Sequence, residues 1–315
     1  MAAYVIGRLG QAAVLLLVMS AVVFAVVHAA PGGPAILNNP DIDPRVAQEM
    51  ARNLGLEDPL PVQYARWLGS LLRGKLGRSY QHQLPVEQLI LERLPATLLL
   101  TASGLLLSIL LAIPIGILSA TRPYSLLDRL ATLGAFIGVS IPVFWLGMIL
   151  IIIFSVELNW LPSAGMLTAG ASFSLGDLFA HLLLPSLVVA SFPLAQLVRY
   201  TRSALLEVIQ QDYVRTARAK GLTEWQVLTR HALRNALIPV ITVVGLLLPR
   251  LVGGAAITET VFAWPGMGRL AVDAAFTRDY PLVMGITLLM SAVVVLTNLL
   301  TDLLYVYLDP RIRFD

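Results

Sequence analysis

The chain has 315 residues, of which 57% are hydrophobic and only 13% are charged. Soluble domains usually carry about a quarter of charged residues, so this composition excludes an ordinary soluble protein. The formal net charge of +3 says little until each charge is assigned to one side of a membrane. No cysteine is present, which excludes disulfides, thiolate nucleophiles and cysteine-ligated metals. Several apolar runs approach the ~20 residues that cross a bilayer as a helix, so we expect an all-α integral membrane protein.

The first predicted transmembrane helix lies within residues 1–30, and its apolar part runs from Gly10 to Ala30. Arg8 before this run and Val27-His28-Ala29 near its end also resemble a signal peptide with its cleavage site. However, the apolar stretch is long for a signal peptide, and the later spans require a start on the inner side. We therefore interpret the segment as a retained span.

Residues 31–94 are polar, and we expect them to fold as a small helical insertion outside the cytoplasm. Asp43 is a predicted N-cap, followed by Pro44 at the first helical position. Two further helices are predicted, an amphipathic one over Pro61–Arg73 and a short one over Pro85–Arg93. The segment holds seven basic and seven acidic residues, so it carries no bias toward the cytoplasm.

The remaining apolar part, residues 95–310, is predicted to hold five more spans, which makes six in total, and residues 311–315 form a short tail. The expected spans are Pro95–Ala120, Leu130–Val156, Leu178–Val198, Ala236–Phe262 and Pro281–Tyr307. Six prolines interrupt these spans, which is tolerated where neighbouring helices satisfy the freed backbone groups. The prolines indicate either ordinary kinks for packing or a bundle around a polar path.

Basic residues in the loops predict that both termini lie in the cytoplasm. Arg122 and Arg129 lie between the second and third spans, and the tail ends with Arg311 and Arg313. By contrast, the loop from Glu157 to Asp177 contains no lysine or arginine. The same rule assigns the basic loop between the fourth and fifth spans to the cytoplasm.

That loop contains a polar stretch over residues 212–235, with five basic and two acidic residues. Gly221 follows a helix-like stretch, where glycine tolerates the left-handed backbone of a helix C-terminus. Thr223, with Gln226 three residues later, predicts a capping box that starts a second helix. We therefore expect two short helices joined at Gly221, here called the basic knob, on which a soluble partner can dock. A basic face lying on anionic lipid is the alternative.

No catalytic or metal-binding constellation is predicted. Residues 69–75 read GSLLRGK, close to a phosphate-binding loop, but Leu76 replaces the magnesium-binding hydroxyl and the segment follows a helix. The four histidines lack metalloprotease spacing, and no nucleophile elbow occurs. Glu259 and Asp302, the carboxylates that an intramembrane protease would need, fall at opposite ends of their spans.

Four polar residues within the spans are candidates for lining a translocation path. Arg250 lies near the middle of the fifth span, where burial costs at least about 2.5–3.5 kcal/mol, so we expect it to face the bundle interior or water. It either attracts a substrate carboxylate or forms a neutralised pair with a neighbouring span. Gln196, Glu259 and Asn298 are further candidates, although each can instead serve helix packing.

The basic knob and its surroundings resemble the EAA region of permease subunits of binding-protein-dependent ABC importers, and within them the dipeptide, oligopeptide and nickel branch. Arg215-Thr216-Ala217 stands in place of the residues that name the motif, Gly221 supplies its glycine, and Ile238-Pro239 closes it. The glutamate of the general motif is absent. Similar signatures occur across the chain, at Gly77-Arg78-Ser79, residues 258–266 and residues 302–310.

This resemblance implies a permease that is not itself an enzyme and that moves short peptides inward across the bacterial cytoplasmic membrane by alternating access. It implies a second, homologous permease subunit, two cytoplasmic ATPase subunits that use ATP and Mg²⁺, and an extracytoplasmic solute-binding protein. The chain resembles the first permease of such a pair. We expect no cofactor or metal bound by this chain, and no nucleic-acid partner. A nickel chelate, glutathione or another small solute is the alternative cargo.

The resemblance also assigns the coupling to the ATPase to the first half of the basic knob. A short helix held in an ATPase groove, between two spans, can transmit ATP-driven closure to those spans. Small side chains would allow close docking, apolar ones would fill pockets, and cationic ones would meet acidic or backbone acceptors. The predicted coupling residues are Tyr213, Val214, Arg215, Thr216, Ala217, Arg218, Ala219, Lys220, Gly221 and Leu222. A membrane scaffold or sensor that signals through the knob is the alternative from another class.

Overall fold

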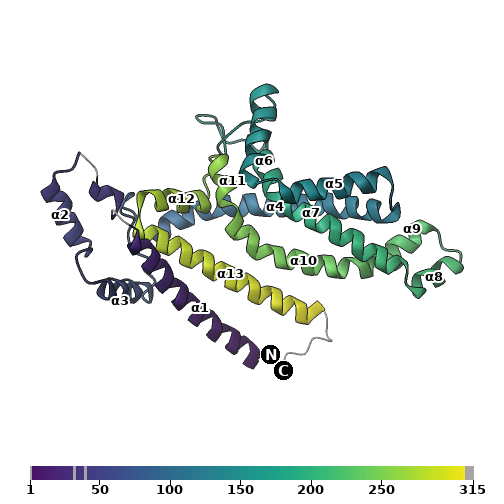
Figure 1. Ribbon diagram of the computed structural model, residues 1–315, viewed down its shortest axis with the longest axis horizontal. Coiled ribbons are helices and arrows are strands. Elements are labelled where there is room, and N and C mark those ends of the chain that lie inside the picture. The colour runs from purple at the N-terminus through teal and green to yellow at the C-terminus, as the bar shows by residue number, and fades with distance from the viewer. Residues whose placement is uncertain (1, 31–32, 39–40, 309–315) are drawn as a thin grey trace.

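The chain is a fan of long helices (Figure 1) in the computed structural model, which describes residues 2–30, 33–38 and 41–308. The surroundings of side chains are described for residues 7–30, 33–37, 41–247 and 255–299. Within the described residues the regular structure is helical, apart from an isolated bridge between Arg78 and Pro85. Among the residues that the structure describes, five helices are long and apolar enough to cross a membrane, and a bent pair makes the sixth when it counts as one span. The predicted all-α fold is confirmed.

The first helix leads into an insertion of short helices, as the sequence predicts. The elements are α1 (Ala2–Ala29), the 3-10 turn η1 (Ala35–Asn38), α2 (Pro44–Asn53) and α3 (Leu60–Leu71). Asp43 caps α2, because its carboxylate accepts a hydrogen bond of 2.8 Å from the backbone N–H of Arg45. In Figure 1 the insertion lies beyond the end of the bundle at which α1 finishes.

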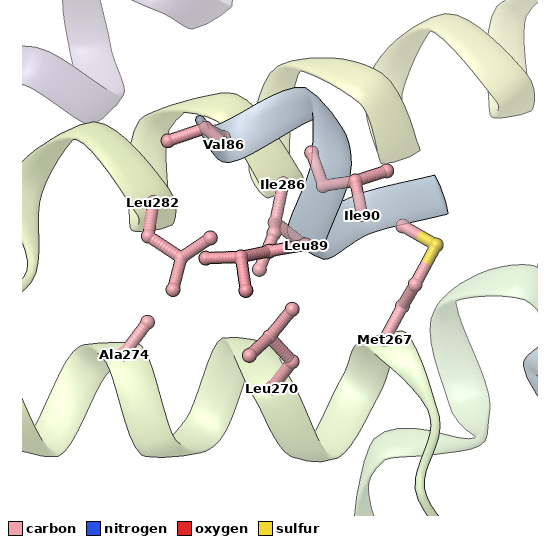
Figure 2. Close-up of a cluster of buried hydrophobic side chains, with 8 residues drawn as sticks. All are labelled: Val86, Leu89, Ile90, Met267, Leu270, Ala274, Leu282 and Ile286. Carbon is pink, nitrogen blue, oxygen red and sulfur yellow. The ribbon is translucent and has the colours of Figure 1, made fainter. Parts of the chain in front are cut away.

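The second span, α4 (Val86–Thr121), is one continuous helix of 36 residues. The separate short helix predicted over Pro85–Arg93 is therefore wrong, since these residues form the start of α4. Val86, Leu89 and Ile90 are buried against α12 and α13, described below, and Figure 2 shows this cluster. Tertiary packing thus holds the first turns of α4 in line with the rest of the helix, although Pro95 lies inside it.

The helix α7 (Leu175–Ile209) runs parallel to α4 at very close range. A Cβ atom added to Gly104 would lie 2.6 Å from Cγ1 of Val189, and one added to Gly116 would lie 2.6 Å from Cβ of Thr201. From the first contact to the second, the residue numbers increase on both helices, so the two helices run in the same direction. Small residues allow helix backbones to approach in this way, and α4 and α7 consequently end on the same side of the bundle.

The third span is bent, which corrects the straight helix predicted over Leu130–Val156. It consists of α5 (Leu126–Ser140), α6 (Val143–Leu150) and the π-helical η2 (Ile151–Glu157), with an angle of 110° between the two parts. Ile141 is extended, with φ −76° and ψ 127°, because a residue before proline is disfavoured in the helical region. Pro142 therefore ends α5 and starts α6 in a new direction (Figure 1).

The remaining elements depart from the predicted spans in two places. The elements are α8 (Asp212–Ala219), α9 (Glu224–Gln226), the π-helical η3 (Val227–Ala232), α10 (Leu233–Gly254), α11 (Ala256–Val261), α12 (Met267–Thr277) and α13 (Tyr280–Leu308). The second knob helix continues through η3 into α10 without a break, rather than ending before the fifth span. The predicted span Ala236–Phe262 is divided, since α10 ends at Gly254 and α11 follows after Ala255.

The two ends of the bundle carry different structures. At one end, the aromatic rings of His28 on α1 and Tyr280 on α13 lie 4.7 Å apart between centroids. At the other end, Gln11 and Asn298 of the same two helices line a common cleft, so α1 and α13 are antiparallel. The start of α1, the end of α13 and the basic knob all lie away from the insertion, on the side here called the knob end, although Figure 1 shows the knob well apart from the ends of α1 and α13. The insertion and α12 occupy the opposite, insertion end.

Candidate functional site

The basic knob is built by the local signals read in the sequence. Gly221 has φ +79°, the left-handed conformation that ends α8 and turns the chain toward α9. The Thr223 hydroxyl accepts a hydrogen bond of 3.4 Å from the backbone N–H of Gln226, whose side-chain oxygen accepts one of 3.2 Å from the Thr223 N–H. The predicted capping box and the helix–glycine–helix arrangement are confirmed.

A small apolar core holds the knob together. Val214, Ala217 and Val227 are buried, with Val208 and Leu222 packed against them. Val214 and Ala217 belong to the predicted coupling residues, but their side chains are buried by contacts within the chain and are not accessible to a partner. Since Val208 belongs to α7, the same core fixes the knob to the end of that helix.

The outer surface of the knob carries the other predicted coupling residues. Arg218 pairs with Glu224 across the turn at 2.8 Å, and Arg215 pairs with Asp212 at 3.5 Å. Most of the coupling set is exposed, namely Tyr213, Arg215, Thr216, Arg218, Ala219, Lys220 and Gly221, and Leu222 is half-buried. Trp225, which the sequence reading did not single out, is 72% exposed. Both acidic residues of the knob are thus matched to an arginine, and Lys220 and its basic neighbours face outward.

A carboxylate junction, which the sequence analysis did not predict, lies at the same end of the bundle. Asp128 of α5 is 3% exposed and accepts bonds of 2.6 Å and 2.9 Å from the Arg202 guanidinium of α7. Its oxygens also accept from the Ser119 hydroxyl of α4 and, at 2.8 Å, from the backbone N–H of Tyr124. This knob-end junction joins three helices at one side chain. The sequence signal was an Asp directly before Arg129 at the start of an apolar span, with nothing to identify its partner on another helix.

A second carboxylate junction lies at the insertion end. Asp279 is 1% exposed and accepts hydrogen bonds from the Ser79 hydroxyl at 2.5 Å and from the backbone N–H groups of Tyr80 and Gln81, each at 3.1 Å. Burial, reinforced by the negative charge of Asp279, raises the pKa of Tyr80 to about 12, so its phenol stays neutral. The Gly77-Arg78-Ser79 signature therefore ties the loop before α4 to the start of α13.

The signature over residues 258–266 forms a compact turn against the start of α4. Glu259 is fully enclosed, and its carboxylate accepts bonds from the Thr97 hydroxyl at 2.7 Å and from the backbone N–H of Arg269 at 2.9 Å. The indole of Trp264 donates to the Ala96 carbonyl at 2.9 Å. Thr97 also accepts from the backbone N–H of Met267 at 2.8 Å. This turn consequently fastens α11 and α12 to α4.

The three predicted path residues whose side chains the structure describes lie in different surroundings. Glu259 lies inside the turn just described, and Gln196 is half-buried on α7. Asn298 is exposed and lines a cleft of about 450 Å³ between α1 and α13. Arg250 falls in α10, but its side chain lies outside the described residues. Their role in a path stays a prediction.

The helical bundle, with its spans, polar junctions and cationic knob, defines a multi-pass membrane protein. Residues 112–314 match the family described as "Binding-protein-dependent transport system inner membrane component", and residues 1–101 match the N-terminal component model of such systems. The chain belongs to this family. It is therefore a multi-pass inner-membrane subunit of a transport system that depends on a binding protein, and it is not itself an enzyme.

Relatives match over nearly the whole chain. It is 46% identical to "Oligopeptide transport system permease protein AppB" of Bacillus subtilis (strain 168), over 100% of both chains. It is 38% identical to "Dipeptide transport system permease protein DppB" of Escherichia coli (strain K12), over 98% of both. The fold resembles a chain of the inward-facing MetNI methionine ABC transporter, with a TM-score of 0.54, 22% identity, and coverage of 70% of this chain and 97% of that one. The last similarity bears on the fold alone.

Proposed function

We propose that the chain is the permease subunit of an ATP-driven ABC importer that passes short peptides across the cytoplasmic membrane by alternating access. Two relatives that match at 46% and 38% identity are named as oligopeptide and dipeptide permeases. Nickel chelates and glutathione, the alternative cargo, receive no such support from the relatives' names. The peptide assignment is therefore the one we carry forward.

The proposed importer contains a second homologous permease, two cytoplasmic ATPase subunits and an extracytoplasmic solute-binding protein. ATP and Mg²⁺ are used by the ATPase subunits, and this chain binds neither. The basic residues at the knob end favour a cytoplasmic location for it, since cytoplasmic loops carry an excess of lysine and arginine. The insertion end then faces the binding protein.

We assign the ATPase contact to the outer surface of the basic knob. Val214 and Ala217 are excluded from this surface, because they fill the knob's own core. Tyr213 is 42% exposed and Trp225 is 72% exposed, and aromatic anchors of this kind often dominate the binding free energy of an interface. The exposed cationic side chains, led by Lys220, suit acidic or backbone acceptors on the partner.

The observation that carries this proposal is that the knob is packed internally and is attached to a span at each end. It has its own core and a capping box, it follows α7 after two residues, and it continues into α10 through η3. A flexible basic loop lying on lipid would need none of these features. A rigid body inserted between two spans can pass a displacement to both of them.

A substitution at Gly221 tests the coupling role. Gly221→Val places a β-branched residue at φ +79°, which costs about 1–2 kcal/mol in the left-handed region and should distort the turn between α8 and α9. Since 1.4 kcal/mol corresponds to a factor of ten, we expect peptide uptake to fall roughly tenfold or more. Uptake of a labelled dipeptide by cells, with co-purification of the ATPase subunits, measures the effect.

Gly74→Val is the matched control, because Gly74 has φ +75° and, like Gly221, no atom within 4 Å of an added Cβ. It lies in the insertion and should leave ATPase co-purification unchanged. Normal uptake by the Gly221→Val protein, at a normal membrane level, would contradict the coupling role.

A further inference from the structure

We propose that the Asp128–Arg202 pair is the positioning contact that carries movement of the basic knob into the bent span formed by α5, α6 and η2. The inference rests on the proposed function, because the movement begins with an ATPase acting on the knob. Neither residue touches the cargo in this account. Together they form the point about which α5 turns.

The first step is the continuous, packed connection between the knob and Arg202. The helix α7 continues without a break from Arg202 to Ile209, and two residues then lead into α8. Val208 packs into the knob core. Leu205 is buried against Ala232 of η3, at the other attachment of the knob. Movement of the knob must therefore move the last turns of α7 and the guanidinium that they carry.

The second step is the strength of the contact at Asp128. The carboxylate receives a two-pronged contact from Arg202, which fixes orientation as well as distance. The Ser119 hydroxyl and the Tyr124 N–H fill its remaining acceptor positions. Asp128 also lies in the first turn of α5, where the helix dipole favours a negative charge, and its own N–H donates to the Ser125 cap at 3.3 Å. The start of α5 is consequently held firmly.

The third step is an open groove beside the middle of α5. A groove of about 280 Å³ lies beside the middle of α5, lined by Ala131, Gly134 and Gly138 of α5 and by Ser191 and Leu194 of α7. Its floor is a direct contact, because a Cβ added to Gly138 would lie 3.4 Å from the Ser191 carbonyl oxygen. A Cβ added to Gly134 would meet no atom within 4 Å. A helix that is fastened at its first turn and borders an open groove farther along can swing into that groove about the fastened end. Because α5 ends at the 110° bend, such a swing displaces α6 as well.

The central test uses Asp128→Asn in the complete complex of permeases, ATPases and binding protein, reconstituted in lipid vesicles. Asparagine keeps the size and one acceptor oxygen but removes the negative charge that holds the guanidinium. We expect the complex to assemble and to hydrolyse ATP, while peptides imported per ATP hydrolysed fall by roughly 2- to 30-fold, the range for coupling residues outside binding sites. Arg202→Lys keeps the positive charge but lacks the two-pronged guanidinium, and it should give an intermediate ratio of peptides imported to ATP hydrolysed.

Asp58→Asn provides the control, because it breaks an arginine pair of similar length, 2.7 Å to Arg66, in the insertion. It should leave the ratio of peptide to ATP unchanged. An unchanged ratio in Asp128→Asn would overturn the proposal. If the wild-type complex showed no ATP-dependent peptide uptake, the proposed function would fail instead, so the two failures are distinguishable.

A second variant keeps the inference testable if Asp128→Asn does not assemble. Gly134→Leu fills the space beside α5 and leaves the knob-end junction untouched. We expect assembly and ATP hydrolysis near the wild-type level with uptake strongly reduced, because α5 can no longer swing toward α7. Normal uptake by this variant would show that the groove plays no part and would overturn the proposed movement.

Discussion

Three buried carboxylates show how single residues organise this membrane protein. Asp128, Glu259 and Asp279 are at most 3% exposed, and each accepts hydrogen bonds from segments distant in the chain. The Thr97–Glu259 contact spans 162 residues, and the Ser79–Asp279 contact spans 200. A buried carboxylate is tolerated when hydrogen bonds or an opposite charge satisfy its oxygens. Each therefore acts as a specific connection between helices, which apolar packing alone would not define.

The Glu259 site makes a prediction at the residue scale. A Cβ added to Gly266 would lie 2.3 Å from the carboxyl carbon of Glu259, which cannot swing away without losing its bonds to Thr97 and Arg269. We expect Gly266→Ala to destabilise the protein by about 1–3 kcal/mol, the usual cost of overpacking. Thermal unfolding of the detergent-purified protein should show a midpoint several degrees lower.

Gly69→Ala serves as its control, since Gly69 lies in α3 with no atom within 4 Å of an added Cβ. It should unfold at or slightly above the wild-type temperature, because alanine is the better helix former. Equal midpoints for the Gly266 variant and the wild type would refute the tight turn.

Local signals in the sequence predicted local structure well, but they did not predict partners. Asp43 as a cap, Gly221 as a turn and Thr223 as the start of a capping box depend on neighbours within a few residues, and all three occur as expected. Asp128 was overlooked, and Glu259 was left as either a path residue or a packing residue, because a carboxylate's role depends on donors supplied by other helices. No pattern within one segment identifies Arg202 or Thr97 as those donors.

At the scale of elements, proline has opposite effects in different spans. Pro95, Pro114, Pro185 and Pro193 lie inside continuous helices, whereas Pro142 separates α5 from α6 at 110°. Neighbouring helices can satisfy the backbone groups that a proline leaves free, so its effect depends on packing. This explains why the sequence predicted six spans but neither the bend in the third nor the continuity of α4. The division expected between residues 94 and 95 falls inside that continuous helix.

The parallel pair of α4 and α7 makes a prediction about two elements together. Gly116→Ala would place its Cβ 2.6 Å from Cβ of Thr201 and 3.1 Å from the Val198 carbonyl oxygen, which forces the helices apart. We expect a loss of roughly 1–3 kcal/mol in unfolding free energy. Thr201→Gly in the same protein removes the nearest clashing atom, so the double variant should be more stable than additivity predicts, by about 0.5–3 kcal/mol.

Thermal unfolding of the two single variants and the double variant measures this coupling. Gly10→Ala is a suitable reference, because Gly10 lies on α1 and an added Cβ meets nothing within 4 Å. Strictly additive effects at Gly116 and Thr201 would mean that the two helices do not meet at this register.

At the scale of the whole molecule, the two ends of the bundle are built for different contacts. The knob end holds the cationic knob and the Asp128 junction and, apart from them in the fan, the start of α1 and the end of α13, whereas the insertion end holds α2, α3 and α12 (Figure 1). The family models also separate the chain near the middle of α4, with one match ending at residue 101 and the other beginning at 112. The first span and the insertion are thus connected directly to α4, the long helix that packs along α7.

This polarity predicts which introduced cysteines react from outside the cell. The chain has no cysteine, so each introduced thiol is unique. Leu72 in the insertion end is 82% exposed and Phe173, in a loop without lysine or arginine, is 67% exposed. At the knob end, Leu126 is 73% exposed and Trp225 is 72% exposed.

In intact spheroplasts, a membrane-impermeant maleimide should label Leu72→Cys and Phe173→Cys, and should label Leu126→Cys and Trp225→Cys only after permeabilisation. Because the lysine and arginine bias assigns the knob to the cytoplasm, labelling of Trp225→Cys from outside would remove the ATPase from reach of the knob, and with it the proposed coupling.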